Sequence, residues 1–185
     1  MEQLDDKYFI DRVINGDADA FVYIVRNYER MIFTVVSRIV RRKDIAEDLT
    51  QDIFLKVYQS LTKYKGKSKF STWLYTIAYN EALMYIRSNK KEAINYEVDY
   101  QDLSDSKASE ELIEALELEQ QLHYLKKAIG RLPSEDALLI SLFYLDEHSI
   151  KEMSEITGLT ESNLKVKLHR TRKVLYSEMT KMMKV

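Results

Sequence analysis

The stretch from Asp44 to Asn80 combines three kinds of side chain that do different chemistry. Its first part carries carboxylates and one amide beside an apolar helical stripe, forming an acidic, water-facing surface: Asp44, Glu47, Asp48, Gln51 and Asp52. A loop around Gly66 then holds four lysines: Lys63, Lys65, Lys67 and Lys69. The helix that follows is rich in aromatics, with Trp73, Tyr75 and Tyr79 before Asn80. Aromatic rings stack on unpaired bases for about 1–3 kcal/mol each, and lysines follow phosphates. The stretch therefore predicts a protein that docks on a partner while it holds single-stranded nucleic acid.

A second group of cations lies on the last predicted helix. Ser149-x-x-Glu152 is a capping box that opens a short helix ending at Gly158, and Thr160 starts a longer one. This order of helix, Gly turn and longer helix is the helix-turn-helix pattern. The buried side of the longer helix is predicted to be Leu164, Leu168, Thr171 and Leu175. Its exposed side carries side chains suited to base edges and phosphates: Ser162, Asn163, Lys165, Val166, Lys167, His169, Arg170, Arg172 and Lys173.

Other kinds of site find no support in these residues. The three histidines, His123, His148 and His169, are far apart and stand in no metal-ligand spacing, so no metal or other cofactor is expected. There is no phosphate-binding glycine loop and no activated nucleophile, which argues against an enzyme. The absence of cysteine fits a cytoplasmic protein. The chain has no long apolar run, so no membrane insertion is expected.

The elements that position these residues are expected to be helices, because the chain has one proline, four glycines and few alternating apolar runs. Four helices with short connections would make one compact domain, 1–89. The first two are Leu4–Ile14 and a helix from Ala18 to about Val40 that Asp17 caps. The third begins with a capping-box-like pair, Asp44 and Glu47. The fourth is capped by Ser71 or Thr72 and runs to about Asn89.

The charge pattern separates this domain from the helix-turn-helix. Residues 1–89 hold 14 Lys and Arg against 12 Asp and Glu, residues 90–118 hold 3 against 9, and residues 119–185 hold 11 against 9. The segment 90–118 is therefore predicted to be an acidic linker. Within it, residues 90–109 lose helical periodicity and read either as a solvated tether or as a strand-like mimic that occupies a nucleic-acid channel in a partner. A helix Glu110–Arg131 follows, Pro133 breaks it, and 119–185 forms the second helical domain.

Three strings in this order resemble the sigma factors of bacterial RNA polymerase, specifically the extracytoplasmic-function (ECF, group 4) type of the sigma-70 family. Asp44–Tyr58 resembles region 2.2, Phe70–Asn80 resembles the segment that melts and reads the −10 element, and Leu132-Pro133 with Ser149–Lys173 resembles region 4. The resemblance covers nearly the whole chain. It implies an all-α, two-domain transcription initiation factor that binds core polymerase, directs it to promoters and melts the −10 region.

The same resemblance implies roles for particular residues. The acidic residues of Asp44–Asp52 would dock on the clamp helices of the β′ subunit, and region 4 would sit on the β flap and read the −35 element. The −10 strand would be held by Lys65, Lys67, Ser68, Lys69, Phe70, Ser71, Trp73, Tyr75, Asn80 and Arg87. The family usually has an anti-sigma partner that covers these surfaces.

Some positions depart from the family pattern. Met84 stands where an aspartate is frequent, and Ala137 where an arginine is frequent. Val166 is apolar at a predicted groove position. The alternative function is a helix-turn-helix regulator of duplex DNA with an N-terminal partner or ligand domain; dependence of specific binding on core polymerase discriminates the two.

Overall fold

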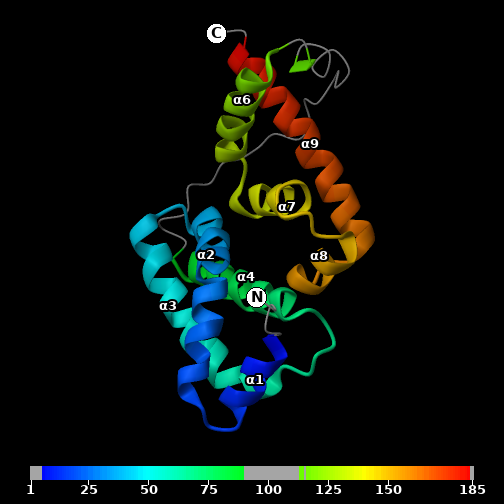
Figure 1. Ribbon diagram of the computed structural model, residues 1–185. Coiled ribbons are helices and arrows are strands. Elements are labelled where there is room, and N and C mark those ends of the chain that lie inside the picture. Colours follow the sequence, from blue (N-terminus) through cyan, green and yellow to red (C-terminus); the bar gives the residue numbers. More distant parts are fainter. Residues whose placement is uncertain (1–5, 90–112, 115, 184–185) are drawn as a thin grey trace. The chain divides into compact units, whose positions relative to one another are not determined.

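The computed structural model describes residues 6–89, 113–114 and 116–183, and these fall into two compact helical units (Figure 1). Every regular element among the described residues is a helix, which confirms the predicted all-α fold of two small helical parts. Residues 90–109, predicted to be a tether or a channel mimic, lie outside the described residues. The predicted domain limits of 1–89, 90–118 and 119–185 stay a prediction.

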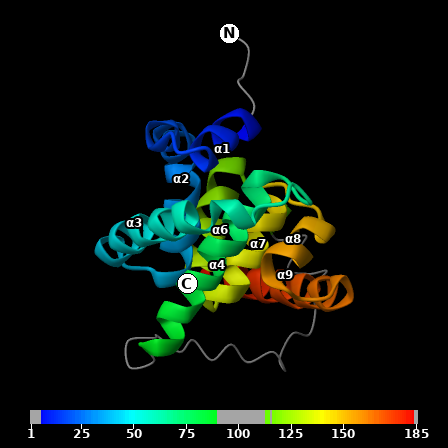
Figure 2. The ribbon, with the colours of Figure 1, turned by 90° about the horizontal axis from the view of Figure 1, so that it is seen from below.

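The first unit consists of four helices and two short 3-10 turns. In chain order these are α1 (Asp6–Ile14), η1 (Ala18–Ala20), α2 (Phe21–Val40), α3 (Lys43–Ser60), η2 (Leu61–Lys63) and α4 (Phe70–Ser88). Helix α2 packs against both α3 and α4, and α2 and α3 lie side by side in both views (Figures 1 and 2). The core side chains with almost no exposure include Ile24, Ile32, Ile39, Ile53 and Leu74. Burial of such side chains is the main force that holds the helices together.

The start of α2 follows the prediction, with one local difference. The Asp17 side chain accepts a hydrogen bond from Ala20 N at 3.2 Å, so Asp17 is the cap that the sequence predicted. The first turn after Asp17 is a 3-10 turn, and the α-helix begins at Phe21.

The predicted cap of α3 is wrong. The helix begins at Lys43 with Arg42 in the capping position, and no side chain caps it. Asp44 lies inside the first turn, where its Oδ2 accepts a hydrogen bond from Arg42 Nη2 at 2.6 Å. The guanidinium is the nearest strong donor, and the carboxylate still faces the positive end of the helix dipole.

The predicted cap of α4 is also wrong. Lys69 occupies the capping position and Phe70 is the first helical residue, so Ser71 and Thr72 lie inside the helix. The Phe70 ring is held among the rings of Tyr28, Tyr64 and Trp73, with centroid distances of 5.5, 5.1 and 5.7 Å. This packing fixes the backbone at Phe70, so the helix starts there and not at the hydroxyl residues that follow.

The second unit is built from α6 (Leu118–Arg131), α7 (Ser134–Tyr144), α8 (Ile150–Thr157) and α9 (Glu161–Met183). Helix α9 packs against both α6 and α7, and an ion pair of 3.3 Å between Arg131 and Glu178 joins α6 to α9. The prediction of one continuous helix from Glu110 to Arg131 is wrong. Glu117 has an extended backbone, and the Leu116 carbonyl freed by this break accepts a hydrogen bond from Gln121 Nε2 at 2.9 Å. Residues 110–112 and 115 lie outside the described residues.

Helices of the described residues are all too short or too polar to cross a membrane.

Candidate nucleic-acid interface

The exposed face of α3 carries the five polar residues that the sequence predicted for docking. All five side chains are exposed: Asp44, Glu47, Asp48, Gln51 and Asp52. Two of them are paired with cations at the start of the helix, Asp44 with Arg42 at 2.6 Å and Glu47 with Lys43 at 3.6 Å. The hydrogen bond from Arg42 lowers the pKa of Asp44 below its ordinary value. Among the described residues, the negative charge of this face is therefore least offset around Asp48 and Asp52.

The lysine loop is closed by a contact that the sequence analysis did not identify. Tyr64 Oη donates a hydrogen bond to the Ser68 carbonyl at 2.8 Å, across a turn in which Gly66 has a φ of 68°. This positive φ is a conformation that glycine adopts without strain. Lys65, Lys67 and Lys69 are exposed on the loop. The closed turn therefore presents several cations within a short segment ahead of α4.

An aromatic cluster fastens this loop to the helices. It consists of Tyr28 on α2, Tyr64 in the loop, and Phe70 and Trp73 at the start of α4, and successive ring centroids lie 5.1–5.7 Å apart. Tyr28 donates a hydrogen bond to Asp6 at 2.5 Å, and burial together with this carboxylate raises the pKa of the tyrosine, which keeps its proton. Packing between these rings therefore holds the lysine loop against the start of α4.

The structure separates core aromatics from exposed ones, a question that the sequence left open. Phe70 is 4% and Tyr75 is 7% exposed, so neither ring has a free face for stacking. The predicted contact of Phe70 and Tyr75 with DNA therefore stays a prediction, and only less buried side chains can stack on a base without a change in packing. Trp73 is half-buried, with its ring partly covered by Phe70 and Tyr64. Phe70 and Tyr64 can thus position Trp73, while Trp73 keeps exposed surface.

A stripe of residues continues from Trp73 along the outer side of α4. The spacings of four, three, four and three residues put its members on one face of a helix: Trp73, Ile77, Asn80, Met84 and Arg87. Asn80 and Arg87 are exposed, and Met84 is 57% exposed although it is apolar. In the sequence, Met84 stands out only because it departs from the family pattern. An apolar side chain at helical spacing is usually predicted to be buried, so its exposure beside Asn80 is a finding of the structure.

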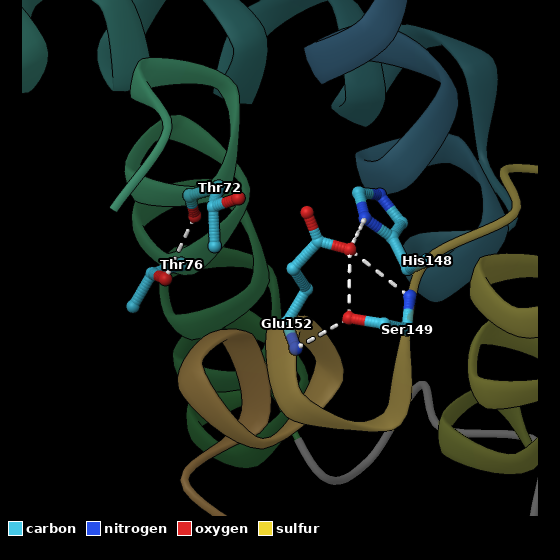
Figure 3. A network of polar contacts seen from close by, with 5 residues as sticks. All are labelled: Thr72, Thr76, His148, Ser149 and Glu152. Carbon is cyan, nitrogen blue, oxygen red and sulfur yellow. Dashed lines mark hydrogen bonds and ion pairs between the residues drawn. The ribbon is translucent and has the colours of Figure 1, made fainter.

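The helix-turn-helix has the local contacts that the sequence predicted. In Figure 3, Ser149 Oγ accepts from Glu152 N at 3.2 Å while the Glu152 carboxylate accepts from Ser149 N at 3.0 Å, which completes the capping box. Gly158 ends α8 with a φ of 72°, and Ser154 Oγ donates to the Leu159 carbonyl across the turn at 2.6 Å. Thr160 Oγ1 accepts from Asn163 N at 3.3 Å and so caps α9.

Helix α9 divides into the two faces predicted for it. The four residues expected on its buried side are buried: Leu164, Leu168, Thr171 and Leu175. Of the predicted DNA-facing residues, those that are exposed are Ser162, Asn163, Lys165, Val166, His169, Arg170 and Arg172. Lys167 and Lys173 are half-buried, and Lys167 lies 3.8 Å from Glu135 of α7, which offsets part of its charge. Lys167 is therefore directed toward α7 more than toward the outer face.

No cluster of His, Asp or Glu in the described part of the chain could hold a metal ion.

Comparison with known protein families gives two matches, one in each half of the sequence. Residues 24–92 match the family described as Sigma-70 region 2, and residues 122–175 match Sigma-70, region 4. Between them, these matches contain the acidic face of α3, the lysine loop, the α4 stripe and most of the helix-turn-helix.

Curated relatives match over almost the whole chain. The sequence is 31% identical over 182 residues to the ECF RNA polymerase sigma factor SigW of Bacillus subtilis (strain 168), covering 92% of this chain and 94% of that protein. It is 30% identical over 180 residues to the ECF RNA polymerase sigma-E factor of Escherichia coli (strain K12), covering 94% of each.

Two solved structures share the fold. One is the sigma factor RpoE in complex with the anti-sigma factor NepR from Bartonella quintana, with a TM-score of 0.63 and 22% identity over 86% of this chain and 96% of that one. The other is CnrH in complex with the cytosolic domain of CnrY, with a TM-score of 0.63 and 17% identity over 93% of this chain and 95% of that one.

Proposed function

The chain belongs to the sigma-70 family as an ECF sigma factor, a transcription initiation factor that directs core RNA polymerase to promoters, and from this premise we propose which of its surfaces perform each step. Three surfaces are available: the acidic face of α3, the lysine loop with the α4 stripe, and the outer face of α9.

The acidic face of α3 docks on the clamp helices of the β′ subunit. This role is supported by the exposure of all five residues from Asp44 to Asp52 on one helix face. Charges at an interface steer association and select partners more than they add affinity. Asp48 and Asp52 form no ion pair within the part of the chain that the structure describes, and we expect them to contribute most.

The lysine loop and the α4 stripe hold the non-template strand of the −10 element. Opening duplex DNA costs about 1.4 kcal/mol for each stacking step. Stacking of a base on an aromatic ring returns about 1–3 kcal/mol, and a displaced base held in a pocket adds contacts of its own. Trp73 supplies the ring, Asn80 supplies hydrogen bonds, and the phosphate contacts come from Lys65, Lys67, Lys69 and Arg87. Ser68 and Ser71, which are half-buried next to these residues in the sequence, are the remaining predicted contacts apart from the buried Phe70 and Tyr75.

Helix α9 reads the −35 element in the major groove. Its first turns carry Ser162, Asn163 and Val166, which are suited to base edges, and the cations further along meet phosphates. The second unit also contacts the β flap. The residues Lys165, His169, Arg170, Arg172 and Lys173 form the phosphate-facing part of the helix.

The remaining properties follow from the family. Sigma factors are not enzymes, and we propose that this chain likewise makes no covalent change to a substrate and works in the cytoplasm beside its polymerase. Because the two structures that share its fold were solved with an anti-sigma factor or a cytosolic partner domain, we propose that an anti-sigma factor covers its surfaces when it is inactive.

The single observation that carries this assignment is the stripe of Trp73, Asn80, Met84 and Arg87, which continues the cationic loop along one side of α4. The test is transcription of fragmented genomic DNA by core polymerase with and without the purified protein, read by sequencing of run-off transcripts. We expect new start sites that share −10 and −35 sequences and that weaken with Asn80→Ala. If the start sites are unchanged by Asn80→Ala and by Arg170→Gln, the assignment of these surfaces is wrong.

A further inference from the structure

Leu55 is an exposed leucine that lies just beyond the acidic face of α3. Its side chain is 62% exposed, more than any other large apolar side chain among the described residues of the first unit. A single exposed leucine on a protein surface is ordinary. The position of Leu55 is unusual because of the residues that surround it.

Helical spacing puts Leu55 among the docking residues. Asp48, Gln51 and Asp52 precede it by seven, four and three residues, so all lie on the same side of α3 and are neighbours on its surface. Tyr58 follows three residues later on the same side and is 44% exposed. The same side of α3 therefore passes from an acidic first half to a second half in which Leu55 and Tyr58 are exposed beside Gln59.

The apolar part is held in place by α2. Tyr58 packs edge-on against Phe21 with ring centroids 5.1 Å apart, and Phe21 also contacts Phe54 at 6.3 Å. We refer to Leu55 and Tyr58 as the apolar extension. Because its tyrosine is fixed by packing, little side-chain freedom is lost when a partner covers it.

We propose that the polymerase-docking surface includes the apolar extension, with Leu55 as its central anchor, and that the polymerase presents an apolar socket bordered by Lys or Arg side chains. This inference rests on the docking role proposed for α3. Charge complementarity identifies one border of the socket, since Asp48 and Asp52 precede the leucine on the same side of the helix and would be met by cations of the partner. An anchor of this kind excludes water when it is seated, which strengthens the charge pairs around it.

The two kinds of residue then act differently. Attraction between exposed charges is screened by salt, whereas burial of apolar surface is not weakened by it. Loss of an acidic residue should therefore weaken docking mainly at low salt, and loss of Leu55 should weaken docking at every salt concentration. This difference allows the apolar contribution to be measured separately from the acidic one.

The experiment measures the affinity of the full chain for core polymerase by fluorescence anisotropy at low and high salt. Leu55→Ala should weaken binding about 10-fold at both concentrations, the size of effect expected when a buried leucine side chain is truncated. Leu55→Met should keep nearly full affinity. Ile14→Ala, which truncates an aliphatic side chain 44% exposed on α1, is the matched control and should bind normally. Asp48→Asn should weaken binding at low salt and lose much of its effect at high salt.

The outcomes separate the inference from the function on which it rests. If Leu55→Ala binds like the unmodified chain while Asp48→Asn is weakened, the apolar anchor is refuted and the docking role of α3 stands. If neither substitution changes the affinity, α3 is not the docking helix. If the loss from Leu55→Ala shrinks with salt as that from Asp48→Asn does, the leucine acts only through the acidic residues and the inference is overturned.

Discussion

Two kinds of aromatic side chain stand at the start of α4, and they contribute to different properties. Phe70 is enclosed by Tyr28, Tyr64 and Trp73, so its ring holds the lysine loop against the helix. Trp73 retains exposed surface at one edge of that cluster and begins the outward stripe. Substitutions at these neighbouring residues should therefore affect different measurements, one the stability of the fold and the other the opening of DNA.

Phe70→Ala should lower the free energy of unfolding by about 3–5 kcal/mol, as expected for a truncated core ring. Trp73→Ala with Asn80→Ala should destabilise the fold less and should impair open-complex formation more than −35 binding. Circular dichroism melting checks the first variant and permanganate footprinting checks the second. Normal melting of the −10 region by the Trp73 and Asn80 double variant would count against their assignment.

Met84 gives a prediction specific to this chain. Its neutral, apolar side chain lies beside Asn80 on the α4 stripe, and such a side chain can pack favourably against a nucleobase ring. Met84→Ala would remove this apolar contact, and we expect up to about fivefold weaker binding of a −10 single strand. Met84→Leu is the matched control and should bind normally in the same filter-binding assay.

At the scale of elements, contacts at the ends of the helices determine the orientation of α9, the helix that we propose reads the −35 element. The capping box of α8 satisfies two free backbone N–H groups at the start of the helix-turn-helix, and His148 Nδ1 lies 3.9 Å from the same Glu152 carboxylate (Figure 3). Gly158 and the Ser154–Leu159 contact then fix the turn into α9. The orientation of α9 therefore depends on short-range contacts in the segment just before it.

Ser149→Ala should destabilise α8 by about 1 kcal/mol, the usual cost of losing an N-cap hydroxyl. The amides of the first turn of α8 should exchange with solvent faster, as measured by hydrogen exchange in the full chain. Ser149→Asp retains an acceptor at the cap and serves as the control. Unchanged protection in Ser149→Ala would mean that the capping box contributes nothing to the stability of α8.

The start of α2 gives a prediction of pH dependence. The hydrogen bond from Arg12 Nε to Asp17, at 2.8 Å, lowers the pKa of Asp17 below its ordinary value. A lowered pKa in the folded state stabilises the fold above the ordinary aspartate pKa, and this contribution is lost as pH falls through the lowered one. Asp17→Asn keeps a capping oxygen but loses the ion pair. Its Tm should be lower than that of the unmodified chain at neutral pH, and the difference should disappear in acid. A constant difference at every pH would refute this role for the pair.

At the scale of the whole molecule, the distribution of charged residues along the sequence bears on how strongly the protein binds DNA. The sequence has a net charge of −2, and both the first 89 residues and the last 67 are only mildly basic. Affinity for free duplex DNA depends on the number of phosphates neutralised, so this distribution favours weak binding by the protein alone. We therefore expect promoter recognition to depend on assembly with core polymerase.

Charge reversal at Asp48 and Asp52 should reduce transcription at every promoter of this factor, because polymerase docking precedes all DNA contacts. Arg170→Gln should instead lower −35 affinity and reduce the slope of log affinity against log salt by about one, the signature of one lost phosphate contact. Pull-down of core polymerase and electrophoretic mobility shifts over a salt series separate the two defects. A DNA-binding defect in the first variant, or a docking defect in the second, would contradict this division.

The sequence by itself determined most of the helices, the caps at Asp17 and Ser149, the start of the last helix at Thr160, and the buried stripe of α9. These depend on contacts between residues at most a few turns apart, which leave a period in the sequence. Only the tertiary structure decided that Phe70 and Tyr75 are core, that Tyr64 closes the lysine loop, and that Leu55 and Met84 are exposed. Burial of a side chain depends on which other helix lies against it, and that partner is far away in the chain. Local pattern therefore identified the surfaces of Asp44–Asn80, while long-range packing chose the side chains that each surface presents.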